Sequence, residues 1–276
     1  MTSTTSPPAQ SNSFSSNAPA RRSEVGQGEL WGKYVRVAAQ LLHGLAHFRL
    51  LGEPGEGEAE SDIRLRAKDL HKLSSSLLSH LKVRHSVIGR LPDAGLLVAN
   101  HLGFLDIMTL SALRPMVFVS KSDVARWPLV GDIASCAGTI YVERSRRTDV
   151  SRVNAALRER LNAGLLVALF PEGTSSDGRS VLPFQPSLLQ PVVDLAVPVT
   201  PAHIAYTGLD GFPAEDIGYF GDRTLGACLL ALFKRRQIQA TVRFGEPVHP
   251  SDNRKTLAAQ LHAAVTDLAG NAGAAP

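Results

Sequence analysis

Cysteine and long apolar runs are both scarce in this chain, and each absence excludes a class of protein. Two cysteines, Cys136 and Cys228, are too few for a disulfide framework or a multi-thiolate zinc site, and their small or apolar neighbours predict buried thiols. No stretch reaches the roughly 18 uncharged apolar residues of a membrane-spanning helix. The polar N-terminus also lacks the charged-then-apolar pattern of a secretory signal.

Charge excess is also modest. Lys and Arg total 29 against 25 Asp and Glu, which gives a net charge of +4. No long basic tract is interleaved with aromatic residues, so we expect no nucleic-acid partner. A mild positive excess suits an anionic membrane surface or a phosphorylated substrate without requiring either.

The N-terminal part of the chain divides into a tail and a helical segment. Residues 1–28 are rich in Ser, Thr, Pro, Asn and Ala, and this composition predicts a disordered tail. Residues 29–82 hold two helical patterns, over 30–51 and 62–81. The apolar positions of the first are Val35, Ala38, Leu42, Leu45 and Phe48. That face fits either a membrane interface or packing on the body of the protein.

From Val83 onward, short apolar runs alternate with helical patterns. Strands are expected at 83–87, 96–99, 116–119, 138–142, 165–170, 197–204 and 240–244, and helices at 107–112, 150–162, 187–195 and 225–235. This alternation predicts an α/β fold with a central, mostly parallel or mixed sheet flanked by helices. We therefore expect one catalytic domain over 83–270, preceded by the N-terminal helical segment.

The stretch Asn100-His101-Leu102-Gly103-Phe104-Leu105-Asp106 directly follows one of these apolar runs. A helix that begins near Gly103 would place Asp106 in its first turn, where the helix dipole favours a carboxylate. A carboxylate that binds one imidazole nitrogen of His101 leaves the other free to accept a proton from a hydroxyl. The same spacing also fits a turn histidine beside a helix-capping aspartate.

Two further polar stretches follow predicted strands. Phe170-Pro171-Glu172-Gly173-Thr174 combines a carboxylate, a glycine that permits a tight turn, and a hydroxyl, so it suits binding of phosphate or polyol oxygens or a simple polar turn. Arg144 lies just after the strand expected at 138–142, and a guanidinium suits phosphate. Lys121, two residues beyond the strand expected at 116–119, is a second candidate cation.

Four blocks together resemble the motifs of the glycerolipid acyltransferases, typified by 1-acylglycerol-3-phosphate O-acyltransferase. They are Asn100–Asp106, Gly138–Ser145, Phe170–Thr174 and Val197–Pro201, in the order and approximate spacing of that family. The resemblance implies that His101 is the general base and Asp106 its orienting partner. It also implies an acceptor site of Arg144, Glu172, Gly173 and Thr174, with Val197–Pro201 lining an acyl-donor or acyl-chain groove.

The same resemblance implies the reaction and its partners. A fatty acyl group would move from acyl-CoA or acyl-carrier protein to 1-acylglycerol-3-phosphate, with no metal, cofactor or covalent enzyme intermediate. The enzyme would act at the cytoplasmic face of a membrane, as a peripheral or interfacial protein.

Two differences from the family pattern leave the identity of the acceptor lipid open. The chain reads Phe184-Gln185-Pro186 where many relatives have a lysine after the phenylalanine, and Tyr219–Thr224 resembles a bacterial branch that includes lyso-ornithine-lipid acyltransferases. A lyso-ornithine lipid is therefore the alternative acceptor. A non-catalytic lipid-binding relative is the alternative from another class, whereas a serine hydrolase is disfavoured because no G-x-S-x-G turn occurs.

Overall fold

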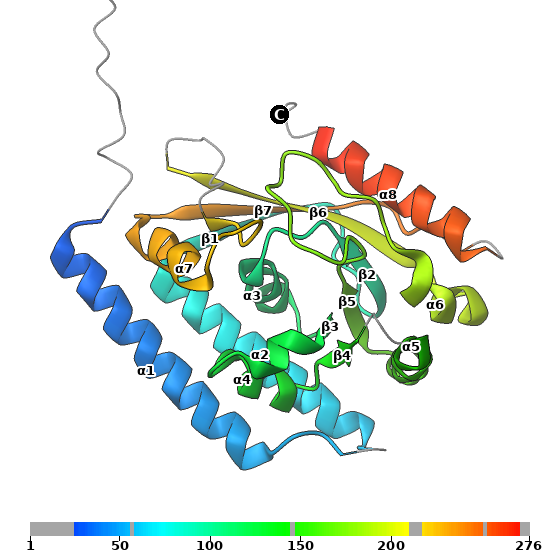
Figure 1. Cartoon of the computed structure of the whole chain (residues 1–276), viewed down its shortest axis with the longest axis horizontal. Coiled ribbons are helices and arrows are strands. Elements are labelled where there is room, and N and C mark those ends of the chain that lie inside the picture. The colour runs from blue at the N-terminus through cyan, green and yellow to red at the C-terminus, as the bar shows by residue number, and fades with distance from the viewer. Residues whose placement is uncertain (1–24, 56–57, 144–146, 210–216, 251–252, 271–276) are drawn as a thin grey trace, which may run out of the picture.

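A computed structural model describes residues 25–55, 58–143, 147–209, 217–250 and 253–270 (Figure 1). Seven strands form one sheet. They are β1 (Val83–Ile88), β2 (Gly95–Ala99), β3 (Val117–Lys121), β4 (Ile140–Val142), β5 (Leu166–Leu169), β6 (Val199–Gly208) and β7 (Ile238–Phe244). Their spatial order is β1-β7-β6-β2-β5-β3-β4, and every neighbouring pair is parallel except β6 and β7. The predicted mostly parallel α/β sheet is confirmed.

Helices cover both faces of the sheet (Figure 1). One side carries α1 (Gln27–Leu51), α2 (Glu60–Leu81), α3 (Phe104–Leu113), α4 (Val130–Cys136) and α7 (Leu225–Lys234). The other carries α5 (Arg147–Asn162), α6 (Gln190–Leu195) and α8 (Arg254–Gly270). The apolar sequence of β2 is explained by burial of both its faces. Leu97 and Ala99 belong to the core on the first side of the sheet, and Leu96 and Val98 belong to the core on the other side.

Several boundaries differ from the sequence prediction. Strand β6 begins at Val199, so Val197 and Pro198 precede it, and Lys121 is the last residue of β3 and not a loop residue beyond it. The helix expected at 187–195 is divided into a 3₁₀ turn, Pro186–Leu188, and the short α6. Helices α4 and α8 were not predicted from the sequence. Both cysteines are buried, as expected.

Helix α1 begins at Gln27, so its first two residues belong to the stretch 1–28 that was expected to be a disordered tail. Its predicted apolar face is also divided between two environments. Leu45 and Phe48 are buried against the body, whereas Val35 and Leu42 are exposed. Within the described residues, no helix is both long enough and apolar enough to cross a bilayer.

Candidate functional site

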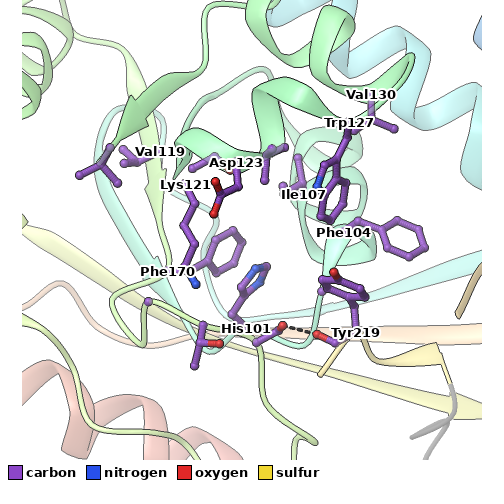
Figure 2. Close-up of a pocket in the computed structure, with 17 residues that line it drawn as sticks. His101, Phe104, Ile107, Val119, Lys121, Asp123, Trp127, Val130, Phe170 and Tyr219 are labelled. Carbon is purple, nitrogen blue, oxygen red and sulfur yellow. Dashed lines mark hydrogen bonds between the residues drawn. The ribbon is translucent and has the colours of Figure 1, made fainter. Parts of the chain in front are cut away.

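The candidate site lies where the carboxyl ends of β2, β3 and β5 meet, the edge at which open α/β sheets bind ligands. A cavity of about 280 Å³ opens here, and we call it the histidine cavity (Figure 2). Its wall includes His101 from the turn after β2, Lys121 from β3 and Phe170 from the loop after β5. The three predicted strand ends are therefore brought together at one place.

His101 and Asp106 form a direct hydrogen bond. The Nδ1 atom of His101 lies 2.8 Å from Oδ2 of Asp106, while the His101 side chain is 21% exposed and the aspartate is fully buried. A carboxylate accepts at this distance, so Nδ1 carries the proton and the other ring nitrogen, Nε2, keeps its lone pair. The imidazole projects into the histidine cavity (Figure 2). The pair can therefore take up a proton from a hydroxyl placed in the cavity.

Asp106 also shapes the turn that carries His101. Its Oδ2 atom accepts the backbone N–H of Leu102 at 2.6 Å and that of Gly103 at 2.9 Å, which caps the start of α3. Its Oδ1 atom accepts the hydroxyl of Tyr206 at 2.9 Å. Asp106 is therefore both the helix cap and the partner of the imidazole, so the two interpretations of the His-Asp spacing are compatible.

Distant segments hold the same turn from the other side. The buried carboxamide of Asn100 accepts the N–H of Ile204 at 2.7 Å and donates to its carbonyl at 3.0 Å, adding one rung to the β2–β6 ladder. The carbonyl of His101 accepts the N–H of Ser176 at 2.8 Å, and that of Leu102 accepts the N–H of Tyr219 at 2.8 Å. The reactive turn is thus anchored to three parts of the chain.

Aromatic rings surround the imidazole. The His101 ring stacks on Phe170, with centroids 4.2 Å apart and planes 19° from parallel. Tyr219 packs edge-on against Trp127 at 5.4 Å, and Ser175 donates its hydroxyl to the Tyr219 carbonyl (Figure 2). Gly103 has φ of 153°, and a Cβ there would lie 3.1 Å from Tyr219. Glycine is therefore required for the close approach of these segments.

Glu172 does not reach the cavity wall, although it was predicted to contact the acceptor. It is 5% exposed, and its Oε1 atom accepts the N–H of Leu182 at 3.2 Å. Burial raises the pKa of its carboxyl to about 8, and the N–H groups of Leu182 and His101 only partly offset this. The structure places Glu172 behind the His101 turn, as a buried support.

The other predicted site residues divide into three groups. Lys121, Gly173 and Thr174 line the histidine cavity, and Gly173 has φ of 74°, a backbone conformation that glycine adopts without strain. Arg144 lies outside the described residues. The segment 197–201 lines neither the histidine cavity nor the cavity next to it, so its predicted role in a groove is not supported by its position.

A second cavity of about 140 Å³ adjoins the first, and its wall is almost wholly apolar; we call it the apolar cavity. It lies among α1, α2, α3, α4 and α7. Six residues line both cavities: Phe104, Ile107, Ser120, Val124, Trp127 and Val130. A ligand with a polar head and an apolar chain could therefore extend from one into the other.

The sequence prediction missed Asp123 and Trp127 in the cavity wall and Tyr206 behind Asp106. Asp123 lies in a 3₁₀ turn, Ser122–Arg126, that directly follows β3, and Trp127 comes just after this turn. Their closeness to Lys121 in the sequence was the available signal. Tyr206 had no such signal. In the described part of the chain, no three His, Cys, Asp or Glu side chains gather in a way that could hold a metal ion.

Comparisons with known proteins identify the family. Residues 82–205 match the family described as Acyltransferase. The chain is 38% identical over 193 residues to the lyso-ornithine lipid O-acyltransferase of Rhodobacter capsulatus, covering 67% of this chain and 70% of that protein. This chain belongs to the acyltransferase family. The acyltransferase is also 32% identical over 153 residues to the 1-acyl-sn-glycerol-3-phosphate acyltransferase of Neisseria gonorrhoeae, covering 55% and 60% of the two chains.

A solved structure supports the fold of this acyltransferase. The 1-acyl-sn-glycerophosphate (LPA) acyltransferase PlsC from Thermotoga maritima superimposes with a TM-score of 0.64. The match covers 90% of this chain and 96% of that one, at 19% sequence identity. The arrangement of sheet and helices is therefore shared, including the N-terminal helical part of the chain.

Proposed function

We propose that this acyltransferase moves a fatty acyl group from a thioester donor, acyl-CoA or acyl-carrier protein, to a hydroxyl of a lysolipid. The observation that carries the proposal is the 2.8 Å contact between His101 Nδ1 and Asp106 Oδ2, with the imidazole in the wall of a cavity. Nε2 of His101 takes the hydroxyl proton as the oxygen attacks the thioester carbon. The carbon–sulfur bond then breaks, and the proton passes to the leaving thiolate.

The apolar cavity supports a lipid substrate. Its wall is formed by side chains such as Leu73, Leu77, Met108 and Phe118, and it shares Phe104 and Ile107 with the histidine cavity. Burial of an acyl chain there contributes favourable free energy for each methylene removed from water. The reacting carbonyl would then lie next to His101 while the chain extends among the helices.

For the acceptor, we propose a lyso-ornithine lipid. Among the described residues, the polar part of the histidine cavity holds one cation and one anion, Lys121 and Asp123 (Figure 2). An ornithine headgroup presents a carboxylate and an ammonium, so it matches this pair of opposite charges. A phosphate would gain from Lys121 but would be repelled by Asp123. The 38% identity to a protein named for this acceptor agrees with that choice.

Lysophosphatidate, the acceptor expected first from the sequence, remains the second candidate. Lys121 in the cavity wall favours it, and so does the 32% identity to a 1-acyl-sn-glycerol-3-phosphate acyltransferase. The non-catalytic alternative is disfavoured because the His101–Asp106 pair is assembled and open to the cavity.

The reaction is tested with purified protein, acyl-CoA or acyl-carrier protein as donor, and both lysolipids as acceptors. His101→Ala should lower turnover by roughly a hundredfold or more, because a general base is removed. The control is His249→Ala, which changes an exposed histidine. Equal turnover of His101→Ala and the parent would refute the assigned base.

The acceptor is tested with Asp123→Asn. We expect KM for lyso-ornithine lipid to rise about three- to tenfold, the range for loss of one partly exposed ion pair. KM for lysophosphatidate should stay the same or fall. Asp267→Asn, on α8, is the control for loss of an exposed carboxylate. An equal rise of KM with both acceptors would contradict the proposed role of Asp123.

We further propose that the outer face of α1 rests on a membrane surface at the cytoplasmic side. Trp31, 70% exposed, begins an outward stripe that continues through Val35, Ala38 and Leu42, spaced three or four residues apart. The opposite face of α1 packs on the body, and Tyr34 stacks on Phe233 of α7 at 4.3 Å. An interfacial helix would bury such a stripe in the headgroup region.

A matched pair of substitutions tests this surface. Ala38→Glu places a charge within the stripe, whereas Ala263→Glu places the same charge on the exposed side of α8, across the sheet. We expect Ala38→Glu to lower cosedimentation with anionic liposomes severalfold and Ala263→Glu to leave it unchanged. Equal binding of both variants would show that α1 is not the contact.

A further inference from the structure

Tyr206 is a buried residue of β6 that lies outside all four sequence motifs and one position beyond the family match. Its hydroxyl lies 2.9 Å from Oδ1 of Asp106 and 3.1 Å from the hydroxyl of Thr109 on α3. Asp106 and Thr109 share one face of α3, three residues apart. The tyrosine hydroxyl is therefore enclosed by one carboxylate and one hydroxyl.

The direction of these hydrogen bonds follows from the groups involved. A carboxylate only accepts, and a phenol has a single proton, so Tyr206 donates to Asp106. The Thr109 hydroxyl then donates to the oxygen of Tyr206. Burial and the Asp106 charge both raise the pKa of Tyr206 well above its usual range, which keeps the phenol a donor. The hydrogen bonds therefore run in one direction: Thr109 donates to Tyr206, and Tyr206 donates to Oδ1 of Asp106. His101 donates to the other carboxylate oxygen, Oδ2.

The two carboxylate oxygens of Asp106 accept different numbers of hydrogen bonds. Oδ2 accepts three donors: the backbone N–H groups of Leu102 and Gly103 and Nδ1 of His101. For Oδ1, the hydrogen bonds of the described residues provide one donor, Tyr206. Because the carboxylate is fully buried, loss of that donor cannot be compensated by solvent without rearrangement.

We propose that Tyr206 is a positioning residue for acyl transfer: it holds the Asp106 carboxylate in place and limits how strongly that carboxylate retains the imidazole proton. The inference rests on the proposed function of His101. A donor on Oδ1 draws negative charge away from Oδ2 and so weakens the attraction of Asp106 for a protonated His101. Tyr206 thereby helps the base both to accept a proton and to release it during the reaction.

Other titratable and charged groups around His101 must be considered in any pH dependence. Lys121 and Asp123 face it across the histidine cavity, and Glu172 lies behind its turn. On β6, His203 lies near Asp106, but burial and Arg243 of β7 lower the pKa of His203 to about 4. His203 is therefore neutral at the pH of the assay, and Tyr206 is the group that bonds Asp106 directly from this strand.

The first test is Tyr206→Phe, which removes the hydroxyl and keeps the ring. The acid limb of the kcat/KM profile should move to higher pH by about half to one unit, the effect of losing one hydrogen bond to a buried carboxylate. The titration midpoint of the His101 imidazole, followed by ¹⁵N NMR without substrate, should move in the same direction. The NMR signal is assigned with His101→Gln.

Tyr141→Phe is the matched control. The Tyr141 hydroxyl is half-buried and lies 3.1 Å from that of Ser135, away from Asp106. Tyr141→Phe should leave both the pH profile and the His101 titration unchanged. Thr109→Val is the second test variant; it keeps the Tyr206–Asp106 contact but removes the donor behind it, and a smaller shift in the same direction is expected.

The outcomes separate this inference from the proposed function. If no acyl transfer is detected but the His101 titration shifts in Tyr206→Phe, Tyr206 still sets the state of the pair and the proposed reaction fails. If Tyr206→Phe and Thr109→Val lower activity with neither the profile nor the titration moved, Tyr206 is a packing residue and the inference is overturned. If Tyr206→Phe does not fold, Thr109→Val alone decides by the same criterion.

Discussion

The buried carboxyl of Glu172 makes a quantitative prediction about stability and pH. Burial raises its pKa from 4.5 to about 8 in the folded protein. Between those values the folded state binds more protons than the unfolded state, so the contribution of Glu172 to stability is full below pH 4.5 and is lost as pH rises toward 8. Glu172→Gln is neutral at every pH and keeps an oxygen for the N–H of Leu182.

The magnitude follows from the size of the shift. At 1.36 kcal/mol for each pKa unit, the whole window corresponds to roughly 5 kcal/mol, of which about 3.5 kcal/mol falls between pH 5 and pH 8. The free energy of unfolding of Glu172→Gln, relative to the parent, should therefore increase by about that amount over this range. Other groups titrate alike in both proteins and cancel from the difference.

Urea unfolding of the parent and of Glu172→Gln at pH 5, 6, 7 and 8 measures this difference. Glu246→Gln, which changes an exposed carboxylate, is the control and should show no trend. A constant difference between Glu172→Gln and the parent would refute the argument from burial. Since Glu172 is mostly protonated at pH 7, Glu172→Gln should also keep KM for the acceptor within about twofold, unlike a residue that binds substrate through its charge.

Three further predictions concern the supports of the site and of α1. Asn100→Ala should lower the free energy of unfolding by about 2 to 5 kcal/mol in urea titrations, because the buried N–H and carbonyl of Ile204 lose their partner. Gly103→Ala should lose about tenfold or more in kcat, whereas Gly138→Ala, which also has positive φ but nothing within 4 Å of its Cβ, should show strain in stability alone. Arg66→Met should lower the thermal midpoint by several degrees, since the buried guanidinium bonds three backbone carbonyls and Glu58.

The sequence predicted the architecture because the signals for it are local. Each core strand is a short apolar run, and β2 is apolar at every position because both of its faces are buried. The His101–Asp106 pair was also predictable, since both residues belong to one strand-to-helix turn. The short turn and the start of α3 bring the two side chains near each other, and the distant segments then fix the turn in place.

The remaining parts of the site depend on which way side chains point and on distant partners. Glu172 and Thr174 belong to one motif, yet Thr174 lines the cavity and Glu172 is buried behind it. Periodicity likewise detected the apolar residues of α1 but not their division between an inner and an outer face. The role of Tyr206 could not be predicted at all, because a tyrosine in an apolar strand has the pattern of any core residue until the partner of its hydroxyl is known.

The anchoring of the His101 turn has a consequence for biosynthesis. Its partners lie far downstream: Tyr206 is 100 residues beyond Asp106, and Ile204 is 104 beyond Asn100. During translation the motif leaves the ribosome long before those partners are made, so a nascent or prematurely terminated chain carries the intact motif without an assembled base. Catalytic competence therefore arises late in synthesis, when β6 pairs with β2, and fragments that end before β6 should be inert toward thioesters.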